Sequence, residues 1–218
     1  MAVTKISEFM SKVGRQGGMS LTTGFDVEFD FGGNSKSWSN FYTDDNKDIV
    51  TMLCDEAQLP NVQSSVGSIT GRYLGEGAIY YPHTRLYTDV SLGFLMDADL
   101  IPLKFFTAWY DYIFGEGDQK THNGSISGAR SAAARTTSRV NRVKYPYTYT
   151  STTRIIKTEP NSISSNDRAP IVYTLENCYP YSIDAVPLSY GTSQVARVNV
   201  NFYYTRHTIS YGTSSNVR

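Results

Sequence analysis

The amino-acid sequence predicts a mainly β protein with one well-defined helix near its middle. Apolar and polar residues alternate in two stretches of the last third of the chain, residues 171–176 and residues 197–204. Neighbouring side chains of a strand point to opposite faces, so each stretch predicts a strand with one apolar and one polar face. The 17 tyrosines and 10 phenylalanines agree with this prediction, because aromatic residues favour strands and tyrosine is also frequent at protein interfaces. A monomeric sandwich and an assembling protein share this composition.

Length and charge narrow the possible classes of protein. A chain of 218 residues is long enough for one domain with a sizeable core, and its net charge of zero gives no general affinity for nucleic acid. The charges are unevenly distributed, because residues 1–118 hold 16 acidic and 8 basic side chains whereas residues 119–218 hold 4 acidic and 12 basic ones. The two halves either neutralise each other within one chain or meet on neighbouring copies.

Cysteine usage and hydropathy indicate a protein made in a cytoplasm. Two isolated cysteines, Cys54 and Cys178, form neither a metal-site spacing nor a disulfide framework, and they fit a reducing compartment. No apolar run approaches the roughly 20 residues that span a bilayer, and the N-terminus lacks the apolar core of a signal peptide. We therefore expect no membrane anchor.

The N-terminal region predicts a helix, a hinge and a strand. Apolar residues recur at helical spacing within residues 4–14, where Thr4 is a plausible N-cap and Gly14 a plausible end. A glycine-rich hinge at residues 14–18 leads to a strand at residues 25–31. The apolar face of that strand is aromatic, whereas its other face carries three carboxylates, which must be solvated or met by cations. These carboxylates are Asp26, Glu28 and Asp30.

The next elements are a polar loop, a hairpin and a further strand. Residues 32–47 predict a loop that ends in an acidic cluster of Asp44, Asp45 and Asp48, followed by a short helical or irregular piece through residues 53–57. A glycine turn at residues 75–77 predicts a hairpin between residues 62 and 81. Residues 86–94 alternate as a strand does, with the apolar side chains of every second residue on one face.

One helix is predicted after this strand. Asp99 is a candidate N-cap, Pro102 occupies the first turn and Gly115 is a candidate end. The apolar face carries Phe106, Trp109, Tyr110 and Ile113. An aromatic stripe at helical spacing is far more often a face packed on a sheet than a cofactor site. We expect the acidic pair of Asp97 and Asp99 to cap this helix in preference to binding a metal.

Residues 115–144 predict a basic loop with no acidic side chain after Asp118. A loop of this length is uncommon in a compact domain unless it has a function. Phosphate binding, an assembly contact and disorder are alternatives, whereas the lack of interleaved aromatics disfavours stacking on single strands. A strand at residues 145–157 and a turn-rich connector at residues 160–168 follow. A second turn-rich segment with Pro180 and Pro187 precedes the final strand.

No motif predicts an enzyme, a metal site or a cofactor. The histidines His83, His122 and His207 are scattered and have no ligand-spaced partners. The glycine-rich segments lack the strand–loop–helix setting and the lysine of a phosphate-binding loop, and no nucleophile elbow is present. Carboxylates are numerous, but no feature selects a glycosidase pair among them.

Several stretches taken together resemble the tail tube protein of contractile-tailed bacteriophages. The first, residues 9–31, is a helix and a glycine-containing hinge before a Phe-x-Val-x-Phe strand. The second, residues 53–113, contains Leu-Cys-x-x-Ala-x-x-Leu-Pro, a Gly/Tyr-rich hairpin, Tyr-Thr-Asp-Val-Ser-Leu-x-Phe and Asp-x-Asp before the aromatic helix. The third, residues 175–204, contains Leu-Glu-Asn-Cys-Tyr-Pro and Val-x-Val-x-Phe-x-Tyr. These motifs cover about two thirds of the chain in the same order.

The resemblance implies a β-sandwich or barrel-like fold with one packed helix, in a single domain over residues 1–218. It implies hexameric rings in which strands join edge to edge into an inner barrel, and stacking of the rings into a hollow tube. Edge pairing between copies satisfies backbone groups that are otherwise an aggregation hazard. This domain includes the N-terminal helix and hinge, at about residues 4–18, and carries a basic loop insertion at about residues 117–144.

The resemblance also implies a structural role in the virion, after assembly in the host cytoplasm. The partners implied are further copies of the chain and the tail sheath, tape-measure, baseplate and tail-terminator proteins, and double-stranded DNA would pass through the bore during ejection. The longer segments at residues 32–47 and 117–144 leave open a protein that caps one end of the tube. A type VI secretion-like tube subunit and a monomeric β-sandwich binding module are further alternatives.

Two strand faces are candidates for lining the bore, because carboxylates or neutral polar groups let DNA slide whereas cations hold phosphates. One carries Asp26, Glu28 and Asp30, and the other carries Asn199 and Asn201 beside Arg197, whose charge argues against a fully repulsive face. A contact between copies is predicted from opposite charge, between Arg130, Arg135, Arg139 and Arg142 of the basic loop and Asp44, Asp45 and Asp48.

Overall fold

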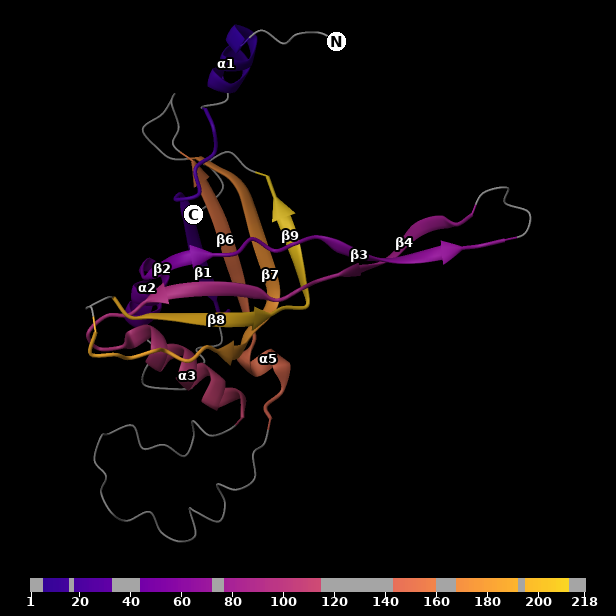
Figure 1. The fold of residues 1–218 in the computed structure, drawn as a ribbon. Coiled ribbons are helices and arrows are strands. Elements are labelled where there is room, and N and C mark those ends of the chain that lie inside the picture. The colour runs from indigo at the N-terminus through magenta and orange to yellow at the C-terminus, as the bar shows by residue number, and fades with distance from the viewer. Residues whose placement is uncertain are drawn as a thin grey trace, which may run out of the picture.

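A seven-stranded antiparallel sheet, folded over along its longest strand, forms the body of the molecule (Figure 1). The computed structural model describes residues 6–15, 18–32, 44–71, 77–114, 143–159, 168–191 and 195–211. Within these residues the sheet order is β1-β6-β7-β8-β5-β2, with β9 paired to β7, and a separate two-stranded sheet joins β3 to β4.

The elements follow one another along the chain with these bounds: α1 Ile6–Arg15, β1 Phe25–Asp30, α2 Asp44–Met52, β2 Cys54–Ala57, β3 Gln63–Ile69, β4 Ile79–Leu86, β5 Val90–Leu95, α3 Ile101–Ile113, α5 Pro146–Tyr149, β6 Ser151–Glu159, β7 Arg168–Ile183, β8 Arg197–Tyr203 and β9 Arg206–Ser210.

Strand β7 divides the sheet into two halves. Residues up to Cys178 pair with β6 and β9, whereas residues 179–183 pair with β8. Asn177 lies at this change of partner with a φ of 55°, a left-handed conformation that asparagine tolerates better than most residues. The halves β1-β6-β7-β9 and β7-β8-β5-β2 therefore run in different directions, as Figure 1 shows.

An aromatic core fills the space between the two halves and helix α3. The ring of Phe29 on β1 lies 5.9 Å from that of Phe202 on β8 and 6.0 Å from that of Phe106 on α3. The buried indole of Trp109 donates a hydrogen bond of 2.8 Å from Nε1 to the carbonyl oxygen of Tyr149. This core confirms the mainly β fold, the packed helix α3 and the predicted alternation of β1 and β8. Helix α2 is a second packed helix that was not predicted, because its Val50 is fully buried in the same core.

Helix α3 confirms the predicted aromatic stripe but begins differently. Phe106, Trp109 and Ile113 are buried, and Tyr110 is half-buried. The Ile101 N–H donates to Asp97 Oδ1 at 2.7 Å, and Leu100 occupies the cap position in a left-handed conformation. Asp97 of the acidic pair therefore caps the first turn, whereas the prediction of Asp99 as the N-cap was wrong.

Five further features differ from the sequence-based expectations. Helix α2 begins at Asp44, inside the predicted loop, and β2 replaces the irregular piece at residues 54–57. The predicted strand 86–94 is interrupted, because β4 ends at Leu86 and β5 starts at Val90. The predicted strand 145–157 begins with helix α5, and β7 runs through Pro180 to Ile183 where a turn was expected.

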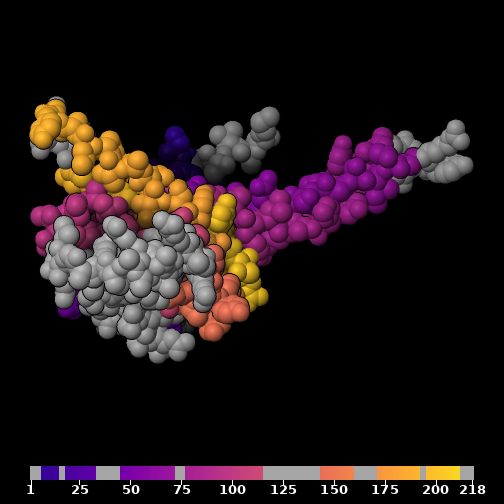
Figure 2. All heavy atoms as spheres, turned by 90° about the horizontal axis from the view of Figure 1, so that it is seen from below, coloured from indigo at the N-terminus to yellow at the C-terminus, as the bar shows by residue number. Residues whose placement is uncertain are grey.

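Two elements project from the body. Helix α1, predicted from its spacing, stands apart from the sheet with Ile6, Phe9 and Met10 exposed (Figure 1). The β3–β4 hairpin, residues 63–71 and 77–86, extends away from the body as a long narrow projection (Figure 2), and we call it the arm. No helix of the described segments has the length and apolar character needed to cross a membrane.

Candidate assembly surfaces

The outward face of β7-β8-β5-β2 is polar, and its one arginine is neutralised by acidic residues from a distant part of the chain. Arg197 of β8 forms ion pairs with Asp55, at 3.5 Å, and with Glu56, both on β2. The guanidinium lies over Gly93 of β5, where a Cβ would overlap its nitrogen atoms. Only β5 lies between β8 and β2, and Gly93 of β5 has no side chain to block the arginine. The Arg197 side chain can therefore reach across β5 to the carboxylates of β2.

The rest of this face is uncharged or acidic. Asn199 is exposed, and half-buried Asn201 donates from Nδ2 to Asp184 Oδ1 at 3.3 Å. The rings of Tyr181 and Tyr203 stack with centroids 4.0 Å apart, and the Tyr181 hydroxyl donates to Asp89 at 2.7 Å. That hydrogen bond to a carboxylate raises the pKa of Tyr181 to about 12. The candidate bore residues of β8 thus belong to a surface without an unpaired cation among the described residues.

The second candidate face lies on the opposite half of the sheet. Asp26, Glu28 and Asp30 are exposed on β1, as predicted, and Glu28 is 3.6 Å from Arg154 of β6. Ile156 lies beside Asp26 on this face and is 3% exposed. Ile156 packs with Val172 in a small apolar cluster apart from the main core. Because the inward side chains of β1 and β8 meet in the core, the two candidate faces point away from each other.

Two strand edges of the four-stranded half lack partners within the described residues. Strand β2 pairs only with β5, and residues 179–183 of β7 pair only with β8. A hollow of about 520 Å³ lies beside the β2 edge, lined by Thr22, Thr23, Phe25 and residues 54–57. Unpaired edges are templates for another strand, so these two edges are candidate contacts between copies.

The arm exposes apolar side chains on both of its faces. Val66 and Tyr80 lie on one face, and Ile69, Ile79 and Tyr81 lie on the other. An isolated two-stranded hairpin is marginally stable in water, so a partner surface is expected to stabilise it. The hairpin was predicted from the sequence, but its two apolar faces were not. The signal was present, because an ordinary surface hairpin has one polar face.

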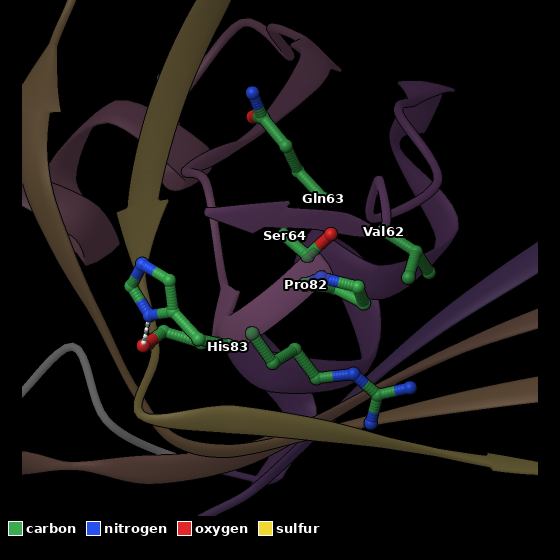
Figure 3. Close-up of a pocket in the computed structure, with 7 residues that line it drawn as sticks. Val62, Gln63, Ser64, Pro82 and His83 are labelled. Carbon is green, nitrogen blue, oxygen red and sulfur yellow. Dashed lines mark hydrogen bonds between the residues drawn. The ribbon is translucent and has the colours of Figure 1, made fainter. Parts of the chain in front are cut away.

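A hollow of about 290 Å³ at the base of the arm offers no converging set of groups. It is lined by Val62, Gln63, Ser64, Pro82, His83, Thr84 and Arg85. Figure 3 shows Val62, Gln63 and His83 spreading in different directions around it, with His83 Nδ1 hydrogen-bonded to Thr84 at 2.7 Å. No cluster of three potential metal ligands occurs in the segments that the structure describes.

Only the acidic side of the predicted contact between the basic loop and the acidic cluster lies within the described residues. Asp44 begins α2, and the side chains of Asp45 and Asp48 are exposed on it. Arg130, Arg135, Arg139 and Arg142 lie outside the described residues. Their pairing with α2 stays a prediction.

Both cysteines act as small protonated side chains. Burial raises the pKa of Cys178 to about 12, and burial together with neighbouring Asp55 raises the pKa of Cys54 to about 12. Cys178 is fully buried, whereas Cys54 is half-buried. Neither thiol ionises appreciably near neutral pH, so neither is a reactive nucleophile.

The fold is shared with proteins of contractile injection systems. A chain of the PVC sheath–tube complex in its extended state is 10% identical, with a TM-score of 0.53 over 89% of this chain and 93% of that chain. A chain of the anti-feeding prophage baseplate is 10% identical, with a TM-score of 0.51 over 88% and 96%. A chain of the cap that terminates the anti-feeding prophage tube is 12% identical, with a TM-score of 0.51 over 89% and 92%.

No curated protein matches the sequence. Residues 20–210 match the phage tail tube protein family. This match spans most of the chain and includes every described helix and strand except α1. This is a family of structural proteins, in agreement with the expectation that the chain is not an enzyme. The chain belongs to the phage tail tube protein family.

Proposed function

We propose that this chain is the tube subunit of a contractile phage tail, in which six copies form a ring and rings stack into a tube. The observation that carries the proposal is the four-stranded half of the sheet, which has a mainly polar outward face and two edges that no described strand pairs with. Family membership supports the same conclusion. Pairing β2 of one copy with residues 179–183 of β7 in the next would close a barrel without free edges.

The dimensions of such a barrel suit a conduit. Six copies of four strands give about 24 strands, and at roughly 4.8 Å between strands the circumference is about 115 Å. The backbone diameter is then about 37 Å, and tilted strands widen it further. The outward face of β8 would line this bore, because it is mainly polar, with Leu95 of β5 as an apolar neighbour of Arg197, while the β1 face holds two buried apolar side chains.

The surface of the bore would not bind the DNA that passes through it. Phosphates bind cations, and Arg197 already pairs with two carboxylates of β2. Asn199 and Asn201 add neutral polar groups to this face. We infer that double-stranded DNA slides past this surface during ejection.

The arm would link copies through the apolar side chains on its two faces.

The other partners are the tail sheath, the tape-measure protein, the baseplate and the tail terminator, and the assembled virion forms in the host cytoplasm. A single domain with an added N-terminal helix and a basic loop at about residues 117–144 accounts for this role. We further propose that the arginines of that loop meet α2 of a neighbouring copy. Reversing Arg135 and Arg139 to glutamate is expected to weaken assembly, and tube lengths that do not change with salt would count against the contact.

The edge contact is tested by cross-linking. In a Cys54→Ser background, Glu56→Cys on β2 is combined in turn with cysteine at each of residues 179–183 on β7. Within one chain these edges are about 14 Å apart across three strand spacings, too far for a disulfide that needs Cα atoms within roughly 7 Å. Oxidation should therefore link only different copies, and the ladder on a non-reducing gel should end at six. Single-cysteine variants are the controls. A ladder absent in every combination, or ending at another number, contradicts the proposal.

The choice of bore face is tested by labelling assembled tubes. Asn199→Cys in the Cys54→Ser background should react with a small maleimide but be protected from a bulky PEG-maleimide, because it faces the bore. Asp26→Cys is the matched variant on the other candidate face and should react with both reagents. The reverse pattern would place the β1 carboxylates in the bore instead.

A further inference from the structure

His207 is a buried histidine at the junction between the arm and the body. It lies on β9 opposite Leu175 of β7, and it is 4% exposed. Tyr87, the first residue after β4, packs edge-on against the imidazole with ring centroids 5.2 Å apart. Tyr173 of β7 and Tyr204 each lie 5.9 Å from it. Three tyrosines from separate parts of the chain therefore enclose the imidazole.

The surroundings of His207 favour the neutral imidazole. Its Nδ1 is 3.4 Å from the Tyr204 hydroxyl, while Nε2 is buried without a hydrogen-bond partner among the described residues. Burial, and secondarily the positive charge of Arg85, lower the pKa of His207. An imidazolium here would place a buried proton donor and a positive charge in a site with no acceptor for Nε2.

The charged groups around this site do not offset such a charge. From the arm comes Arg85, whose guanidinium carbon lies 6.0 Å from the centre of the Tyr87 ring. From β9 and β7 come Arg206 and Glu176, which are paired with each other at 2.5 Å. Asp89 and the protonated thiol of Cys178 lie near Tyr204. Asp89 already accepts a hydrogen bond from the Tyr181 hydroxyl. No carboxylate forms an ion pair with His207 within the described segments.

We propose that His207 is an acid-sensitive latch between the arm and the body. The neutral imidazole completes a tyrosine cluster that holds Tyr87 and Arg85, and with them the end of β4, against β7 and β9. Figure 1 shows the arm leaving the body beside β9. Protonation places a charge in the cluster next to Arg85, so the cluster opens and the arm is released. The consequence for tube assembly depends on the proposed role of the arm, whereas the latch itself does not.

The direction of the pH effect follows from proton linkage. The folded-state pKa lies below the ordinary value of 6.5 that the released histidine would have. The latch is therefore fully closed above about pH 6.5. As the pH falls toward the folded-state pKa, the equilibrium constant for opening of the latch rises tenfold for each pH unit, because the open form binds one more proton than the closed form. Below the folded-state pKa the constant levels off.

The test uses hydrogen exchange on the full-length chain at a concentration where it is unassembled. Protection factors of amides in residues 84–87 are compared with those of β8 from pH 7.5 to pH 5.0, and NMR follows the His207 ring protons. We expect His207 to titrate below pH 6.5 and protection at residues 84–87 to fall up to tenfold per pH unit while β8 stays protected. His207→Phe, which keeps an aromatic ring in the cluster, should abolish this pH dependence. His83→Gln, which removes the exposed histidine of the arm, should preserve it.

Titration of His207 at or above pH 6.5 overturns the proposal. So does unchanged protection at residues 84–87 while His207 takes up its proton. If His207→Phe does not fold, these two readouts on the unchanged chain still decide. Both are measured without assembly, so a chain that forms no tubes at any pH would defeat the proposed function and leave the latch measurement intact.

Discussion

At the scale of single residues, one lysine–glutamate pair ties the segment before β1 to the end of β6. Lys157 Nζ is 2.7 Å from Glu159 Oε1, and both side chains are largely buried. The same ammonium donates to the carbonyl oxygens of Gly24, at 2.9 Å, and Thr158, at 2.8 Å. The Ser20 hydroxyl donates to Glu159. The cluster fixes the point at which the chain enters the sheet from the N-terminal side.

Glu159 predicts a specific loss of stability in acid. Hydrogen bonds from Lys157 and Ser20 lower the pKa of Glu159 below its ordinary value of 4.5. Its stabilising contribution is therefore present above about pH 4.5 and is lost as the pH falls through the folded-state pKa. Glu159→Gln should lower the free energy of unfolding at pH 7 and flatten its decline below pH 4.5, measured by urea denaturation.

Glu8→Gln is the control for this prediction. Glu8 forms an exposed pair with Lys12 one turn along α1, at 2.8 Å. Exposed pairs contribute about 0.5 kcal/mol or less, so this variant should behave like the unchanged chain. An acid profile of Glu159→Gln that matches the unchanged chain would remove Glu159 from the account.

Gly24 predicts a steric cost. A Cβ at Gly24 would collide with the carbonyl oxygen of Thr158, a backbone atom that cannot rotate away. Gly24→Ala should therefore lower the free energy of unfolding by about 1–3 kcal/mol, as overpacking does, in chemical denaturation. Gly14→Ala in α1 is the control, because beyond its chain neighbours and the backbone of its own helix nothing lies within 4 Å of its Cβ position. Equal stability of the two variants would contradict the close approach of the two segments.

At the scale of elements, the arm is expected to contribute to assembly and little to folding. Tyr80 and Ile79 lie on opposite faces of the arm and are both exposed. Replacing both with serine should change the free energy of unfolding by only about 0.5 kcal/mol, because exposed positions seldom matter more. The same double variant should reduce tube formation, measured by sedimentation. Ser68→Ala is the control on the same hairpin and should assemble normally. Normal tubes from the double variant would exclude the arm from the contact between copies.

The elements also show what sequence reasoning can reach. Strands β1 and β8 were predictable because each buries one face and exposes the other, which is a pattern of period two. Strand β7 was not predictable past Glu176, because it changes partners at Asn177 and tolerates Pro180. Proline is acceptable in a strand at the edge of a sheet, and residues 179–183 form such an edge. Element boundaries of this kind depend on tertiary pairing that local sequence does not contain.

The candidate bore face was likewise only partly predictable from the sequence. The outward placement of Asn199 and Asn201 on β8 was predictable from alternation alone. The neutralisation of Arg197 was not, because its partner Glu56 is 141 residues away and is brought close only by the pairing of β2 with β5. The apolar faces of the arm and the buried setting of His207 were likewise visible only once the strands were placed. Sequence reasoning therefore gave the faces of individual strands, and the structure gave the surfaces that they form together.

At the scale of the whole molecule, the described residues form a folded sheet with two open edges and a protruding arm, which are features expected of a subunit that assembles with further copies. The open edges expose backbone groups that a neighbouring copy would satisfy, and the arm exposes apolar groups that a neighbouring copy would bury. Continued head-to-tail contacts between closed rings give a filament. The function proposed here follows from these open edges and the arm more than from any single residue.

Negative-stain electron microscopy of the purified full-length chain at high concentration tests this claim most directly. The account predicts six-membered rings stacked into hollow tubes, with no other protein present. Their absence from the micrographs, together with a single monomeric species in light scattering of the same sample, would contradict it.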